Sequence, residues 1–143
     1  MDYFAALEIS ASGMTAQKFR LDTVALNIAN ASTTRSLSGG PYRRQHVILG
    51  ERAMTTPFEA ALEREQSIRF RGVQVVQVQE DDAPPRLAFE PGHADADERG
   101  FVEYPNVNPL SEMVILLEAT RLYEANVRAL NAARTMALRA LDI

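Results

Sequence analysis

The residues with the greatest capacity for chemistry are a histidine and three acids in the second half of the 143-residue chain: His93, Asp95, Asp97 and Glu98. An imidazole and several carboxylates are suitable ligands for a divalent cation, and Asp95-Ala96-Asp97 begins like a calcium-binding loop. Arg99, however, occupies the position of the third ligand, where its guanidinium would repel a cation. We therefore predict a structural turn in which the acids cap backbone groups or meet basic neighbours, and no metal site.

The residues that usually serve enzymes as nucleophiles are missing from this chain or lie in unsuitable sequence patterns. The chain contains no cysteine, which excludes disulfides, thiolate catalysis and cysteine-based zinc sites. No serine lies in a nucleophile-elbow pattern, and His46, on a predicted strand beside Arg43 and Arg44, has a different setting from His93. We expect neither enzymatic activity nor a cofactor. A small hydrolase or metal enzyme built on His93 and its acids stays as an alternative, which stoichiometric metal in untreated protein would support.

Composition indicates one folded domain that does not work mainly on nucleic acid. The chain is 46% hydrophobic and 24% charged, as folded proteins are. Its net charge of −4 opposes nucleic-acid binding, although Arg35, Arg43 and Arg44 form a small basic cluster. The N-terminus has no basic region followed by a compact apolar stretch, so we expect no cleaved signal peptide. No segment approaches the ~20 apolar residues that cross a bilayer.

Long helices are predicted at both ends of the chain. Residues 2–31 repeat apolar side chains every three or four positions, which favours packing against a partner helix: Phe4, Leu7, Ala11, Met14, Leu21, Ala25 and Ile28. A second helix begins with Asn108 as N-cap and Pro109 in the first turn, and runs to the chain end. It has the same spacing at Met113, Leu116, Thr120, Tyr123, Val127, Leu130, Ala137 and Leu141. At 1.5 Å per residue these helices are ~45 and ~50 Å long.

The middle of the chain has a different pattern. Gly39-Gly40-Pro41 and Pro84-Pro85 break regular structure, and strands are predicted at residues 42–49, 73–78 and 101–104. Residues 53–66 are a weaker candidate for a short helix. We therefore predict an α+β fold with long terminal helices packed as a coiled-coil-like pair and a small β-rich insert. Its parts are residues 1–34, 35–107 and 108–143.

The terminal helices carry more apolar, charge-poor surface than a hairpin of two helices covers. Residues 113–117, Met-Val-Ile-Leu-Leu, are apolar around more than a full turn, which favours burial on all sides. Each exposed Leu or Ile forgoes ~1.5–3 kcal/mol of burial. An ordinary core, in which both helices fold back on the insert, is the plainer alternative. We predict instead that other chains cover these faces.

Several segments resemble a known family. Residues 11–17 (Ala-Ser-Gly-Met-Thr-Ala-Gln) and 27–34 (Asn-Ile-Ala-Asn-Ala-Ser-Thr-Thr) are similar to the N-terminal signature of the axial proteins of the bacterial flagellum. Residues 82–87, 90–98, 100–102, 104–108 and 119–127 resemble the short, proximal-rod members, so the similarity covers nearly the whole chain. Ala94 replaces a proline that is usual there, and Pro109 lies where helix residues are common.

The resemblance implies a structural role in the flagellar basal body. Such proteins leave the cytoplasm unfolded through the type III export apparatus without signal cleavage. They assemble helically in the periplasm, with copies of themselves, other rod proteins, the distal rod and the export-gate adaptor, and transmit torque from motor to hook. A soluble coiled-coil adaptor or export-linked chaperone is the alternative. The predicted interface comprises Phe4, Leu7, Met14, Leu21, Asn27, Ile28, Asn30, Met113, Leu116, Leu117, Tyr123, Asn126, Val127, Leu130 and Leu141.

Overall fold

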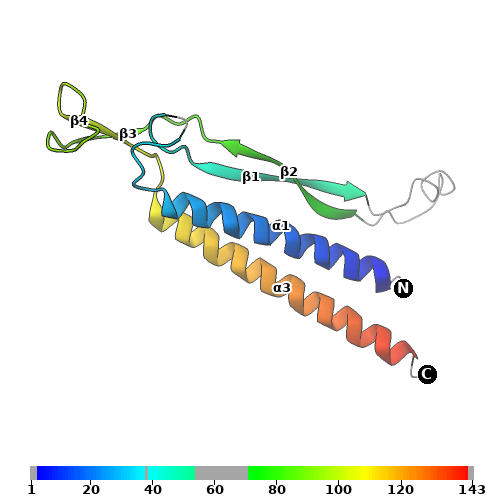
Figure 1. Ribbon diagram of the computed structural model, residues 1–143. Coiled ribbons are helices and arrows are strands. Elements are labelled where there is room, and N and C mark those ends of the chain that lie inside the picture. Colours follow the sequence, from blue (N-terminus) through cyan, green and yellow to red (C-terminus); the bar gives the residue numbers. More distant parts are fainter. Residues whose placement is uncertain (1–2, 38, 54–70, 142–143) are drawn as a thin grey trace. The chain divides into compact units, whose positions relative to one another are not determined.

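The computed structural model describes residues 3–37, 39–53 and 71–141. The elements follow in the order α1 (Tyr3–Ala29), β1 (Gln45–Ala53), β2 (Arg71–Glu80), β3 (Arg86–Phe89), β4 (Phe101–Tyr104) and α3 (Pro109–Leu141) (Figure 1). β1 pairs with β2, and β3 pairs with β4, in two separate two-stranded sheets. Two long terminal helices that pack together, with small antiparallel sheets between them, confirm the predicted fold class.

Side-chain caps define where the two helices end and begin. α1 stops at Ala29 because Asn30 donates from its side-chain Nδ2 to Leu26 O at 2.9 Å, and Thr33 N then donates to Asn30 O at 3.1 Å. Such local bonds compete with helix continuation. α3 begins as predicted, with Asn108 Oδ1 accepting the N–H of Leu110 at 3.0 Å. Asn30, which was predicted to lie in the interface, therefore also ends α1.

One compact unit comprises Met1–Phe19, Ile48–Gln77 and Ala119–Ile143. Within it, α1 and α3 approach closely at Gly13, where an added Cβ would lie 2.8 Å from Oδ1 of Asn126. Val73 N donates to Ser12 Oγ at 3.1 Å, which ties α1 to β2. Small side chains allow this close approach, and the buried helix residues of the unit are all small: Ala5, Ser10, Ser12, Gly13, Ala16, Ala119 and Ala133.

The other compact unit comprises Arg20–Val47 and Val78–Glu118. Its antiparallel hairpin of β3 and β4 places Phe89 opposite Phe101 and buries Val102 completely. Between the strands, residues 90–100 form a chain of turns. An ion pair of 3.7 Å between Arg20 and Glu118 joins α1 to α3 in this unit.

The strands agree in part with the sequence predictions. β4 covers residues 101–104 as predicted, and residues 73–78 lie within the longer β2. β1 starts at Gln45, later than predicted, and β3 was not predicted at all. β3 follows Pro84-Pro85 and has no β-branched residue, so its own sequence carries little strand signal. The predicted short helix at 53–66 falls almost wholly outside the described residues. Among the described helices, none has the length and hydropathy that a bilayer crossing requires.

Candidate functional site

The predicted interface residues occupy different environments in the folded chain. Phe4, Met113 and Leu117 are exposed, with Phe4 at 84% and Leu117 at 58%. Half-buried positions form the larger group: Leu7, Met14, Leu21, Ile28, Asn30, Leu116, Tyr123, Asn126, Val127 and Leu130. Asn27 is fully buried, and Leu141 lies outside the residues whose side chains are described.

The first two turns of α3 carry a continuous exposed apolar stripe. Leu110, Met113, Val114 and Leu117 follow the i, i+3, i+4, i+7 spacing that places side chains on one helix face. Their exposed fractions are 71, 49, 61 and 58%. Leu110 and Val114 were absent from the predicted interface, although Val114 lies inside the apolar run that drew attention to this helix. We call these four residues the α3 stripe.

A buried polar network surrounds Asn27, which was predicted to lie in the interface. Its Nδ2 donates to Gln45 O at 2.7 Å and to Glu112 Oε2 at 3.0 Å, while its Oδ1 accepts Tyr42 OH and Gln45 N, both at 2.9 Å. These bonds use both donors and both acceptor sites of the amide. Asn27 therefore joins α1, β1 and α3 within the chain and has no hydrogen-bonding capacity for a neighbour.

Glu112 is the charged centre of this network. Its side chain is 1% exposed, and its Oε1 accepts Arg44 Nε at 2.7 Å. Arg44 also approaches Asp81 Oδ2 at 3.9 Å, so one arginine links the start of β1 to the end of β2 and to α3. A buried carboxylate is tolerated only when it is paired and hydrogen-bonded, and both conditions are met here.

Tyr42 borders the same network. Burial, followed by the negative charges of Glu112 and Glu80, raises the pKa of the Tyr42 hydroxyl above its usual value of 10.0. The neutral phenol is also the form that donates to Asn27 Oδ1. The protonated form of Tyr42 is therefore favoured in the folded chain.

The acidic loop has the structural contacts that were predicted for it. Asp97 Oδ1 accepts the backbone N–H of Arg99 at 2.9 Å and that of Phe101 at 2.8 Å. Asp95 accepts the Thr34 hydroxyl at 2.8 Å and lies 3.6 Å from the Arg35 guanidinium. Within the part of the chain that the structure describes, no three His, Cys, Asp or Glu side chains gather as a metal site would require.

The two histidines lie in separate places. His93 Nδ1 accepts the N–H of Asp95 at 3.1 Å, and its ring meets that of Tyr104 edge to face. His46 lies on β1, and its Nδ1 is buried with no hydrogen-bond partner among the described residues. Among the described residues, no assigned contact joins either histidine to a serine or threonine hydroxyl.

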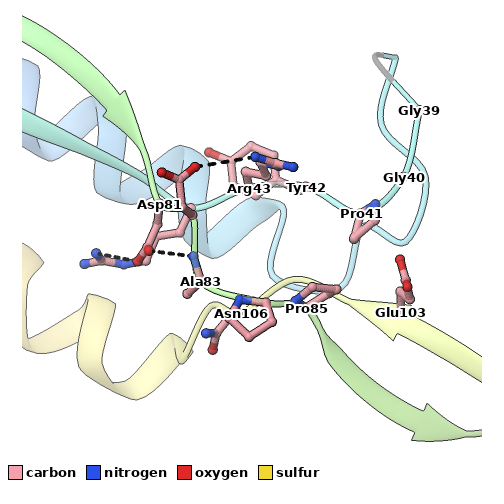
Figure 2. Close-up of a pocket in the computed structure, with 13 residues that line it drawn as sticks. Gly39, Gly40, Pro41, Tyr42, Arg43, Asp81, Ala83, Pro85, Glu103 and Asn106 are labelled. Atoms are coloured by element: carbon pink, nitrogen blue, oxygen red, sulfur yellow. Dashed lines mark hydrogen bonds and ion pairs between the residues drawn. The ribbon is translucent and has the colours of Figure 1, made fainter.

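A pocket of about 390 Å³ opens between the loop before β1 and the segment after β2 (Figure 2). Asp81 Oδ1 accepts Ala83 N at 3.0 Å, and Asp82 lies 3.7 Å from the Arg43 guanidinium. Much of the remaining wall consists of glycine and proline: Gly39, Gly40, Pro41, Pro84 and Pro85. Its charged groups are largely paired with one another, and the pocket suggests a structural junction.

The similarity to known proteins extends over the whole chain. The family model "Flagella basal body rod protein" matches residues 7–35, and "Flagellar basal body rod FlgEFG protein C-terminal" matches residues 98–143. The flagellar basal-body rod protein FlgC of Bacillus subtilis is 42% identical over 100% of this chain and 99% of the relative. That of Borreliella burgdorferi is 37% identical, over 100 and 98%. That of Escherichia coli O6:H1 is 38% identical, over 95 and 93%. This chain therefore belongs to the family of the flagellar basal-body rod protein FlgC, whose members are structural, non-enzymatic subunits of the rod.

Proposed function

We propose that this rod subunit assembles helically, in the proximal part of the rod, with copies of itself and with other rod proteins, and that the assembly transmits torque from the motor to the hook. Its partners then include the distal rod and the export-gate adaptor. A contact between different patches on two subunits propagates as a helix when it does not close on itself. Torque is transmitted by close packing, which resists compression, and no chemical step is required.

The α3 stripe is the observation that carries this proposal. Leu110, Met113, Val114 and Leu117 expose a row of large apolar side chains, and because each is about half to two-thirds exposed, its burial in an assembly would contribute ~1–2 kcal/mol. Neighbouring subunits would supply that cover.

The proposed interface consists of the predicted residues other than Asn27, together with Leu110 and Val114. Residues 1–34 and 108–143 then act as the axial segments, and residues 35–107 as the insert. We further propose that the chain is exported unfolded through the type III apparatus, without signal cleavage, and completes its folding in the periplasm on assembly. Membership of the flagellar rod family supports this route.

A charge placed in the interface tests the proposal. Leu117→Asp or Ile28→Asp should abolish incorporation into basal bodies and swimming, while export of the chain stays detectable, because a buried carboxylate without a partner is strongly unfavourable. His93→Ala, in the loop between β3 and β4, is the control and should be mild. Normal swimming of cells that carry either interface variant refutes the packing argument.

Hydrogen exchange on the purified chain separates the rod subunit from the alternative of a soluble adaptor or chaperone. A monomeric subunit that is completed by its neighbours should have frayed ends, with rapid exchange in the turns of both terminal helices nearest the chain ends. Strong protection along the full length of both helices in a monomer would favour the adaptor.

A further inference from the structure

The β3–β4 hairpin has one covered face and one exposed face. Ala88 pairs with Val102, and Val102 is fully buried. On the opposite face Leu87 pairs with Glu103 and Phe89 with Phe101. The exposed fractions there are 62% for Leu87, 65% for Phe89 and 39% for Phe101. We call Leu87, Phe89, Phe101 and Glu103 the hairpin face.

The aromatic side chains of this face are held in place. The rings of Phe89 and Phe101 meet edge to face with centroids 5.3 Å apart. Gly100 has φ of 81°, and an added Cβ there would lie 3.0 Å from Phe89 Cε2, so only glycine fits beneath the ring. A preorganised apolar surface loses little conformational entropy when a partner covers it.

The hairpin face continues into a groove with an acidic rim. Leu87, Phe101 and Glu103 line a groove of about 400 Å³ together with Pro41 and the loop containing Asp95. The charged residues that line the groove are three acids (Asp95, Asp97 and Glu103) against one arginine (Arg35), a net charge of −2. The groove therefore attracts basic groups.

The acidic residues of the groove differ in the number of hydrogen bonds and ion pairs that they already make within the chain. Asp97 accepts two backbone N–H groups, and Asp95 is held by Thr34 and Arg35. The Glu103 side chain, in contrast, has no hydrogen bond or ion pair with any described residue, and it lies directly beside Leu87 in the register. Figure 2 shows Glu103 beneath Pro41, at the edge shared by the pocket and this groove.

We propose that the hairpin face docks a segment of a neighbouring rod subunit that carries an apolar side chain next to a lysine or arginine. The apolar side chain covers Leu87 and the Phe89–Phe101 pair, and the basic group pairs with Glu103. This inference rests on the proposed helical assembly and adds a contact made by the insert to those made by the terminal helices.

The test is site-specific photocrosslinking in flagellated cells. A benzoylphenylalanine at Phe89 should give an adduct, in purified basal bodies, with a peptide of a neighbouring subunit that contains lysine or arginine next to an apolar residue. The same probe at Ala83, an exposed loop position of the same unit, is the control. Glu103→Lys should reduce the adduct about fivefold, since like charges oppose docking, whereas Glu103→Asp should retain most of it.

The outcomes separate the two proposals. An adduct with a second copy of this chain or with a different rod protein supports docking. A chain that enters basal bodies without an adduct above the Ala83 control, or whose adduct peptide lacks a basic residue, overturns the docking and leaves helical assembly intact. A chain that never enters basal bodies overturns both.

Discussion

Replacement of Arg44 by methionine isolates the contribution of the buried charge at Glu112. Methionine keeps an unbranched side chain of similar reach but removes the guanidinium that donates to Glu112 Oε1 at 2.7 Å. The carboxylate, 1% exposed, would then retain the Asn27 amide as its only described partner. Arg44→Met should therefore lower the stability of the folded chain.

The burial of the two partners sets the size of this effect. Removal of one member of a buried ion pair typically costs about 3–5 kcal/mol, because the other charge is left uncompensated. The Arg44 side chain is 26% exposed, so water can reach part of the site, and we expect the lower end of that range. A loss of about 3 kcal/mol reduces the folding equilibrium constant roughly 100-fold. Glu112→Gln, which leaves Arg44 with Asp81 as its partner and preserves the bond to Asn27, should cost only about 1–1.5 kcal/mol.

Urea unfolding of the monomeric chain, followed by circular dichroism, measures these differences. The amide of Gln45 donates to Asn27 Oδ1 at 2.9 Å, so its hydrogen exchange reports the network locally. Arg43→Met is the matched control, because the neighbouring Arg43 pairs with an exposed Asp82 at 3.7 Å. Such a surface pair should contribute no more than about 0.5 kcal/mol.

The double variant distinguishes a charge effect from a packing effect. In Arg44→Met with Glu112→Gln no unpaired charge stays buried, so the double variant should be more stable than Arg44→Met alone. Equal losses for Arg44→Met and Arg43→Met, or strictly additive losses in the double variant, would show that the buried charge does not govern stability here.

Two further predictions concern Tyr42 and Gly13. Because the pKa of Tyr42 is raised in the folded chain, its contribution to stability is complete below the unfolded value near 10 and is lost as pH rises through the folded pKa. Unfolding measured from about pH 8 to about pH 11.5 should show a smaller alkaline loss in Tyr42→Phe, and an unchanged loss would contradict the assignment. Gly13→Ala brings a Cβ to 2.8 Å from Asn126 Oδ1 and displaces that side chain, which offsets most of the ~1 kcal/mol gained in helix propensity. When Asn126 is also replaced by alanine, Gly13→Ala should stabilise the chain by up to ~1 kcal/mol. A loss of stability in that double variant would show that the added Cβ clashes with the backbone and not with the Asn126 side chain.

The helices and the β4 strand were accessible from the sequence because their signals are local. Asn108 and Pro109 mark the start of α3 through the backbone groups of its first turn, and the structure confirms the cap. The acidic loop was similarly predictable, since Asp97 bonds to amides only two and four residues away. β3 was missed because its strand character depends on β4 as a partner.

The roles of the interface residues required the folded chain. Asn27 and Ile28 are neighbours in the segment 27–34 and were predicted to share the interface. In the folded chain, however, Asn27 is fully buried and Ile28 is half-buried. Leu110 and Val114 looked no different from their apolar neighbours until their exposure was known. Helical periodicity places side chains on a face but does not say which face the rest of the chain covers.

Local sequence was enough to establish the element types at both ends, the turn chemistry of the acidic loop and the resemblance to flagellar axial proteins, because caps, periodicity and motifs depend on residues close in the chain. The folded chain was needed to show that Asn27, Arg44 and Glu112 form one buried network, and that the α3 stripe and the hairpin face stay open. Those outcomes depend on contacts between residues up to 85 positions apart, which no local pattern encodes.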